Sequence, residues 1–128
     1  MTVADCIKMF DKLHPSQYPD EQKVHWLSEC DAKLYKDWRF FLKDTEAPET
    51  PYDPAEAEET ELMLGEPWID LYLLYLLMQV DFWNREITAY NNDLMLWLQR
   101  LSEWGDWASR GGDETAPDGD REARYIKV

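Results

Sequence analysis

EPWIDLYLLYLLMQVDFW, residues 66–83, is the stretch that decides the fold of this chain. Pro67 stands at a suitable first helical position, and apolar residues from Trp68 to Ile87 recur at helical spacing along one side. Three leucines occupy the other side, so the helix predicted over about 67–90 is apolar nearly all round. Such a helix must be buried on more than one face, either as the central element of a domain or against a neighbouring subunit.

Three further amphipathic helices are predicted around this element. Thr2 and Asp5 resemble a capping box with Asp in place of Glu, and Pro19 precedes acidic residues that suit the start of a second helix. Asn91 and Asn92 are candidate caps of the last helix. The alternative that the last two helices form one continuous rod stays open, because Asn within a helix costs at most about 0.7 kcal/mol relative to Ala. The predicted ranges of these three helices are about 3–14, 19–43 and 92–109.

The whole pattern predicts an all-α fold, a small bundle of about four helices in residues 1–110. Residues 111–128 begin with the glycine-rich sequence of a flexible linker and end in an extended C-terminal arm. This arm is basic and strand-forming, and we expect it to bind a partner. Its residues are Arg121, Arg124, Tyr125, Ile126, Lys127 and Val128.

An acidic loop separates the second predicted helix from the third. Residues 44–66 contain nine carboxylates and three prolines, and no Lys, Arg or His occurs between Lys43 and Arg85. Such a segment is expected to be exposed, with a short helical turn at about 54–63. The predicted acidic face, turned toward solvent or toward a channel, consists of Glu56, Glu58, Glu59 and Glu61.

Charge and composition exclude several classes of function. The 128 residues include 27 acidic and 13 basic ones, a net charge of -14, which opposes binding to nucleic acid or to anionic lipid. The most apolar run, residues 71–80, is about half as long as a membrane span. The first residues of the chain show no apolar signal-peptide segment, so a reduced cytoplasmic origin is expected. His14 and His25 lack the spacing of a metal site, and no glycine-rich phosphate loop occurs. We therefore expect no cofactor, no metal and no enzymatic activity.

Three residues within the helical pattern bear a more specific expectation. Asp31 falls in the apolar stripe of the second predicted helix, where an unpaired charge would be costly. It should meet a hydrogen-bonding or charged partner, such as a helix-terminal amide or an arginine, and have a structural role. Cys6 and Cys30 are expected to be buried, unreactive thiols.

The chain is also rich in aromatic residues, with seven tryptophans and seven tyrosines. A monomer of this size can hardly bury them all, and Trp and Tyr are enriched where proteins bind one another. The alternative is a tryptophan-rich core alone. The predicted subunit interface consists of Trp68, Tyr72, Tyr75, Leu76, Trp83, Trp97 and Trp104.

A set of short motifs occurs in a fixed order along residues 2–110. The motifs are Gln17-Tyr18, Trp26-Leu27-Ser28-Glu29 with Asp31, Glu66-Pro67-Trp68-Ile69-Asp70-Leu71-Tyr72, Gln79-Val80-Asp81, Asn84-Arg85-Glu86-Ile87 and Tyr90-Asn91-Asn92. In their order and spacing they resemble the small helical head-tail connector proteins, also called adaptor or head-completion proteins, of tailed bacteriophages and prophages. The resemblance covers roughly residues 2–110, with two departures, the acidic loop at 44–66 and the tail after Gly111.

The resemblance implies a structural virion protein at the head-tail junction, present in the host cytoplasm during assembly. Its subunits, typically twelve, would form a ring beneath the portal protein and give the tail or a stopper protein a docking surface. Residues 121–128 would be the arm that binds the portal. DNA would pass through without specific binding, which suits an acidic wall because like charge repels phosphate.

One alternative from another class accounts for the same acidity. An acidic regulator that mimics DNA would occupy the basic groove of a nuclease or a repressor. Its carboxylates would be spaced like phosphates on one face.

Overall fold

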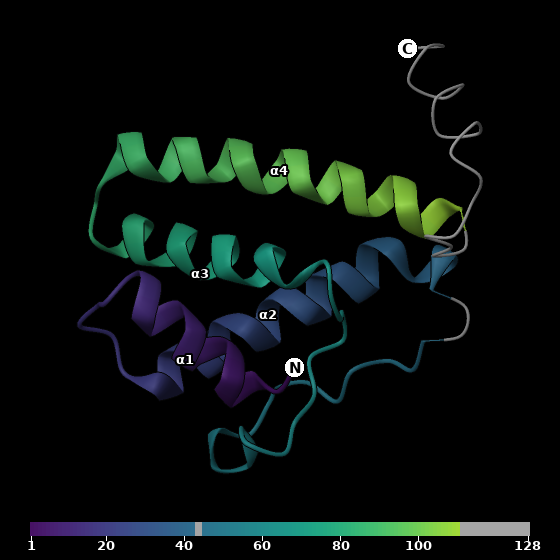
Figure 1. The fold of residues 1–128 in the computed structure, drawn as a ribbon, viewed down its shortest axis with the longest axis horizontal. Helices are drawn as coiled ribbons and strands as arrows, with labels where there is room; N and C mark the ends of the chain where they lie inside the picture. Colours follow the sequence, from purple (N-terminus) through teal and green to yellow (C-terminus); the bar gives the residue numbers. More distant parts are fainter. Residues whose placement is uncertain (43–44, 111–128) are drawn as a thin grey trace.

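A computed structural model of the chain describes residues 1–42 and 45–110, which form a bundle of four α-helices (Figure 1). Within these ranges no strand is present, apart from an isolated bridge between Thr2 and Glu61. The predicted all-α fold is therefore confirmed. The elements are α1 (Val3–Leu13), α2 (Asp20–Trp38), the short 3-10 helices η1 (Arg39–Phe41) and η2 (Pro54–Glu56), α3 (Ile69–Trp83) and α4 (Ile87–Ser109).

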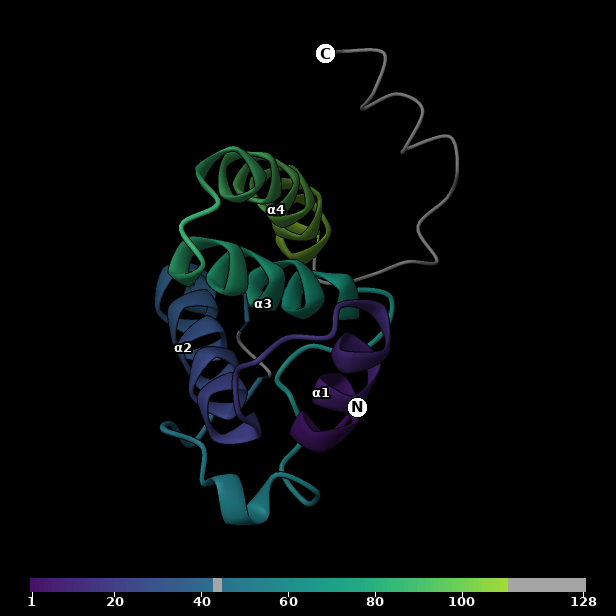
Figure 2. The ribbon, with the colours of Figure 1, turned by 90° about the vertical axis from the view of Figure 1, so that its left-hand side faces the viewer.

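Helix α3 is the middle layer of the bundle. Figures 1 and 2 show α4 lying along one side of α3, with α1 and α2 on the opposite side. Leu71, Tyr72 and Leu76 of α3 are completely buried as a result. The prediction that this helix is buried on more than one face is confirmed, because the elements of its own chain cover both sides.

Helices α1 and α2 pack against each other and against α3. The hydroxyl of Thr2 accepts a hydrogen bond from the Asp5 amide and caps α1, as the capping box predicts. Phe10 is completely buried, and Lys23 of α2 is buried while its ammonium reaches Asp11 of α1 at 2.6 Å. The pairing explains why a lysine is tolerated in the interior.

The boundary between the last two helices differs from its prediction. The break lies at residues 84–86, whereas Asn91 and Asn92 are inside α4. The side-chain oxygen of Asn84 accepts hydrogen bonds from Gln17 and from the Tyr18 hydroxyl, and Arg85 has a φ of 61°. This left-handed residue turns the chain back, so α4 lies along α3. The predicted break at 91–92 and the alternative of one continuous rod are both wrong.

The other boundaries differ by smaller amounts. Helix α2 ends at Trp38 and tightens into η1, instead of running to residue 43. Trp38 leaves the helical conformation with a φ of −121°, and its ring packs edge-on against Trp104 of α4 at 5.5 Å between centroids. The helix therefore ends at the residue that packs on α4. Apolar periodicity along α2 does not predict this contact. The short helical turn predicted at 54–63 is realised as η2 and the turns after it.

The segment between α2 and α3 lies against the N-terminus of the chain. The amides of Val3 and Ala4 donate to the carbonyls of Thr60 and Ala57, both at 2.9 Å. The amide of Leu62 donates to the Met1 carbonyl at 3.0 Å. Tyr52, Leu62 and Leu64 of this segment are buried in the core. The sequence predicts that this segment is simply exposed, but it buries Tyr52, Leu62 and Leu64 while glutamates such as Glu56 and Glu58 stay exposed.

Gly105 in α4 provides a test of this packing. Ala is favoured over Gly within a helix by about 0.8–1 kcal/mol, so Gly105→Ala would ordinarily stabilise the chain. A Cβ at this position would lie 2.5 Å from a ring carbon of Trp38. We expect Gly105→Ala to lower the free energy of unfolding by about 1–3 kcal/mol, measured by urea denaturation. The control is Gly65→Ala, whose Cβ would meet no atom within 4 Å; equal effects of both substitutions would contradict the Trp38 contact.

Candidate interaction surfaces

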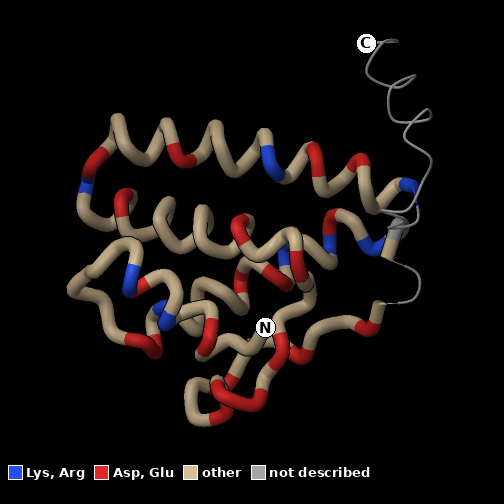
Figure 3. The backbone as a smooth tube through the Cα atoms, in the orientation of Figure 1, with Lys and Arg blue, Asp and Glu red and all other residues tan. Residues whose placement is uncertain are grey.

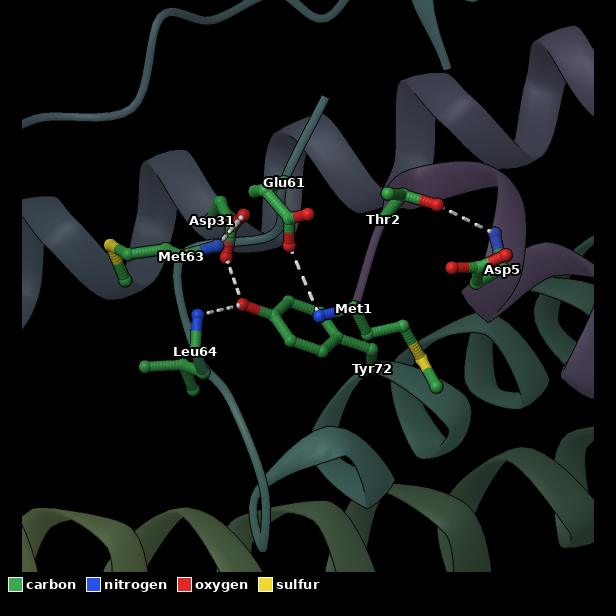
Figure 4. Close-up of polar contacts among 8 residues, drawn as sticks. All are labelled: Met1, Thr2, Asp5, Asp31, Glu61, Met63, Leu64 and Tyr72. Carbon is green, nitrogen blue, oxygen red and sulfur yellow. Dashed lines mark hydrogen bonds and ion pairs between the residues drawn. The ribbon is translucent and has the colours of Figure 1, made fainter. Parts of the chain in front are cut away.

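A buried carboxylate connects three parts of the fold. Asp31 of α2 is completely buried and accepts hydrogen bonds from the Tyr52 and Tyr72 hydroxyls, both at 2.5 Å, and from the Met63 amide at 3.0 Å. The Tyr72 hydroxyl in turn accepts from the Leu64 amide at 2.8 Å, as Figure 4 shows. The prediction that Asp31 is partnered is confirmed, but its partners are two tyrosines and a loop amide. No arginine or helix-terminal amide takes that place.

The electrostatics of this cluster fit a structural role. Burial raises the pKa of Asp31, while its hydrogen bonds to Tyr52, Tyr72 and Met63 lower it. Burial and the nearby charge of Asp31 also raise the pKa of both tyrosines, so their hydroxyls keep their protons and act as donors. With no exposed atom, Asp31 cannot meet a substrate. The role of Asp31 is to hold together α2, α3 and the loop between them.

The two cysteines are also enclosed. Cys6 and Cys30 are free thiols and both are completely buried. Burial, with a contribution from Asp31, raises the pKa of Cys6 to about 12 and raises the pKa of Cys30 as well. They are the unreactive thiols that the sequence predicts. Among the described residues, no group of three or more His, Cys, Asp and Glu side chains is arranged to hold a metal ion.

The predicted subunit interface has to be corrected. Six of its seven residues belong to the core of this chain and are at most 8% exposed, so they offer no surface to a neighbour. Their rings pack on other parts of the same chain, as Tyr75 does on Trp97. Only Trp83 is exposed. The six buried residues are Trp68, Tyr72, Tyr75, Leu76, Trp97 and Trp104.

Other apolar side chains are exposed instead, at the turn between α3 and α4. Phe82 stacks on Trp83 with ring centroids 5.2 Å apart, and Ile87, four residues after Trp83 in the sequence, is the first residue of α4. Trp83 and Ile87 are 61% and 63% exposed, and Phe82 is about half exposed. We call these three residues the apolar corner. The apolar pattern of the sequence did not predict that the apolar corner is exposed. The reason is that this pattern continues through the turn, which has no Gly or Pro.

Helix α4 carries a second exposed apolar group. Met95 and Leu98 lie three residues apart on α4 and are 70% and 50% exposed. They share one side of the helix, since residues three apart are neighbours on its surface. We call this pair the outer α4 face.

A groove lies between α3 and α4. It has a volume of about 450 Å³, and three leucines of α3 with one of α4 form its apolar lining. Arg100 is held at its rim by ion pairs to Asp70 at 2.8 Å and to Glu103 at 2.6 Å, with its guanidinium over the Trp68 ring. The residues that line this α3–α4 groove are His14, Asp70, Leu73, Leu74, Leu77, Leu96, Gln99, Arg100 and Glu103.

The acidic face is exposed as predicted. Figure 3 shows acidic residues along the segment between η1 and α3, where the described residues include no Lys or Arg. Glu56, Glu58 and Glu59 are exposed, and Glu61 is exposed while one of its oxygens pairs with the terminal ammonium of Met1 at 3.1 Å. A concavity of about 640 Å³ beside them is lined by several carboxylates. The predicted channel-facing role of these residues stays a prediction.

The predicted arm lies outside the described residues. This applies to Arg121, Arg124, Tyr125, Ile126, Lys127 and Val128.

No family model, no curated protein and no solved structure matches this chain. In the described part of the chain, no helix is both long enough and apolar enough to cross a membrane.

Replacement of the tyrosine hydroxyls should show what the Asp31 cluster contributes. We expect Tyr52→Phe to lower the free energy of unfolding by about 1–3 kcal/mol, because Asp31 loses a partner in the interior. Tyr72→Phe should cost more, since the Leu64 amide also loses its acceptor. Urea denaturation followed by tryptophan fluorescence measures both. Tyr35→Phe, at a half-buried tyrosine outside the cluster, is the control, and an equal effect at Tyr35 and Tyr52 would contradict a stabilising role of the cluster.

A second buried carboxyl predicts a pH dependence. Burial, and after it the hydrogen bond and charge of Asp81, raise the pKa of Asp93 to about 7. An unfolded Asp has a pKa of about 3.9, so the proton stabilises the folded state. That stabilisation is fully present below about pH 4 and is lost as the pH rises through about 7.

The substitution Asp93→Asn should therefore change stability differently at two pH values. We expect the free energy of unfolding of Asp93→Asn, relative to that of the unmodified chain, to be higher at pH 8 than at pH 5, measured by urea denaturation. Asp37→Asn, on the exposed side of α2, makes the same change of charge and serves as the control. An Asp93→Asn effect that is independent of pH would contradict the raised pKa.

Proposed function

We propose that this chain is a non-enzymatic structural subunit, a head-tail adaptor of the connector type. In this proposal its copies form a ring beneath a portal protein and give the tail or a stopper protein a docking surface. The observation that carries the proposal is the set of apolar side chains exposed at the apolar corner and on the outer α4 face.

These side chains are exposed although the core of the chain is well filled. Trp104, Tyr72 and Phe10 are among the large side chains that are completely buried. Trp83, Ile87 and Met95 are 61%, 63% and 70% exposed in the single chain. Clustered exposed apolar groups mark sites of protein association, and Trp is enriched among residues that dominate binding energy.

The charge of the chain supports the same proposal. A net charge of -14 repels the phosphates of DNA, so a ring of such subunits would let DNA pass without holding it. The buried, fully hydrogen-bonded Asp31 and the enclosed thiols also fit a protein that performs no reaction. Residues 121–128 remain the proposed portal-binding arm on grounds of sequence.

A second candidate function is favoured by one observation. Glu56 and Glu61 are exposed and line a concavity together with other carboxylates, which suits an acidic regulator that binds a basic protein surface in place of DNA. Such binding would depend on electrostatic attraction and would weaken strongly as salt is raised.

The experiment that tests the adaptor proposal is assembly on a portal. The full chain, co-produced with the portal protein from the same genome, should co-purify with it and appear in electron micrographs as a ring below the portal. If the chain stays monomeric and does not bind the portal at about 100 μM, a concentration at which even a weak complex forms, the adaptor proposal is overturned. Co-purification with a DNA-binding enzyme, lost at high salt, would favour the acidic regulator instead.

A further inference from the structure

We propose that residues 87–93, about the first two turns of α4, form a proton-controlled flap on the end of α3. The flap lies closed while Asp81 of α3 and Asp93 of α4 share a proton, and it loosens when that proton is lost. This inference concerns the α3–α4 hairpin of a single chain, so it does not rest on the proposed function.

The two carboxyl groups face each other across the hairpin. Leu77 of α3 and Leu96 of α4 both line the α3–α4 groove. Asp81 follows Leu77 by four residues and Asp93 precedes Leu96 by three, so both aspartates lie one helical turn further along the same two faces. The Asp93 carboxyl is hydrogen bonded to that of Asp81. Such a bond requires that one of the two groups carries a proton.

The surroundings of Asp93 favour the shared proton. Asp93 is 7% exposed, and its Oδ2 atom is enclosed without a hydrogen-bond partner in the part of the chain that the structure describes. An ionised carboxylate in such a place has lost most of its hydration, which is costly. Burial, and after it the hydrogen bond and charge of Asp81, therefore raise the pKa of Asp93 to about 7.

No basic side chain neutralises this pair. Among the described residues, no ion pair joins a Lys, Arg or His to either Asp81 or Asp93. On α2, Lys33 stands over the Trp97 ring, 5.6 Å from its centroid. Once the shared proton leaves, two carboxylates face each other and repel. The charged residues on the surrounding parts of α2 and of the turn are Glu29, Lys33, Arg85 and Glu86.

Contacts on either side limit the loosening to the start of α4. The Trp97 indole nitrogen donates to the Leu71 carbonyl at 3.1 Å, which fixes α4 to α3 one turn beyond Asp93. The side chain of Asn84 holds the end of α3 by two hydrogen bonds to the segment between α1 and α2. Between these anchors, Asp93 is the one buried residue of 87–93. A segment with so little burial opens easily, so the state of Asp93 controls it.

The raised pKa of Asp93 determines the direction of the effect. An Asp freed from the hairpin has a pKa of about 3.9, so the proton favours the closed flap. This preference is fully present below about pH 4 and is lost as the pH rises through about 7. Between pH 5.5 and pH 8.5 the opening equilibrium constant should therefore rise about tenfold or more.

Hydrogen–deuterium exchange of the full chain at these two pH values tests the flap. Each amide is compared with its intrinsic exchange rate at the same pH, which removes the chemical effect of hydroxide. Protection of the amides at 88–93 should fall about tenfold between pH 5.5 and pH 8.5, whereas protection at 97–105 should stay constant.

Three variants identify the carboxyl pair in this measurement. Asp93→Asn and Asp81→Asn each remove one member of the pair, so protection at 88–93 should become independent of pH. Either variant suffices if the other does not fold, which thermal unfolding verifies. Asp37→Asn, on the exposed side of α2, makes the same change of charge and should keep the tenfold fall.

Three outcomes would overturn the flap. An equal fall of protection in all four helices would indicate that the lost proton destabilises the whole fold. Protection at 88–93 that is the same at both pH values in the unmodified chain would also contradict the proposal. So would a fall that persists in both Asn variants of the pair. No portal or second copy enters these measurements, so their outcome leaves the adaptor proposal to its own test.

Discussion

The carboxylate of Asp31 lies in the apolar interior between α2 and α3, and both of its oxygens accept hydrogen bonds. An unpartnered charge there would be very costly, so the fold depends on the groups that approach it. Tyr52 and Met63 come from the acidic loop and Tyr72 comes from the central helix. Through these three partners, one side chain positions a segment whose own carboxylates repel one another.

The filled core determines which surfaces remain for partners. Because α4 covers one side of α3 and α1 with α2 covers the other, Tyr72 and Tyr75 of α3 are buried inside the chain. Large apolar side chains nevertheless remain exposed at several places in the described residues. They are Met9, Leu13, Phe40, Phe82, Trp83, Ile87, Met95, Leu96 and Leu98.

Much of the fold could be predicted from periodicity, because each helix buries one stripe and α3 buries nearly its whole circumference. The need of Asp31 for a partner followed from its place in such a stripe. The break between α3 and α4 could not be found in this way, since it depends on the contacts of the Asn84 side chain with Gln17 and Tyr18, which are distant in sequence, and on the left-handed backbone of Arg85. The predicted interface was wrong at six positions because aromatic content alone does not say which neighbours cover a ring.

The sequence by itself determined the helical class, the acidity and the need to satisfy a buried carboxylate, because these depend on residue type and local spacing. Only the tertiary structure decided that the loop supplies Tyr52, that the hairpin turns at Arg85, and that Trp83 is exposed while Trp97 and Trp104 are buried. Each of these depends on which segments meet in space. The pattern along one helix shows which side of that helix is apolar. Whether another segment covers that side depends on how the whole chain packs.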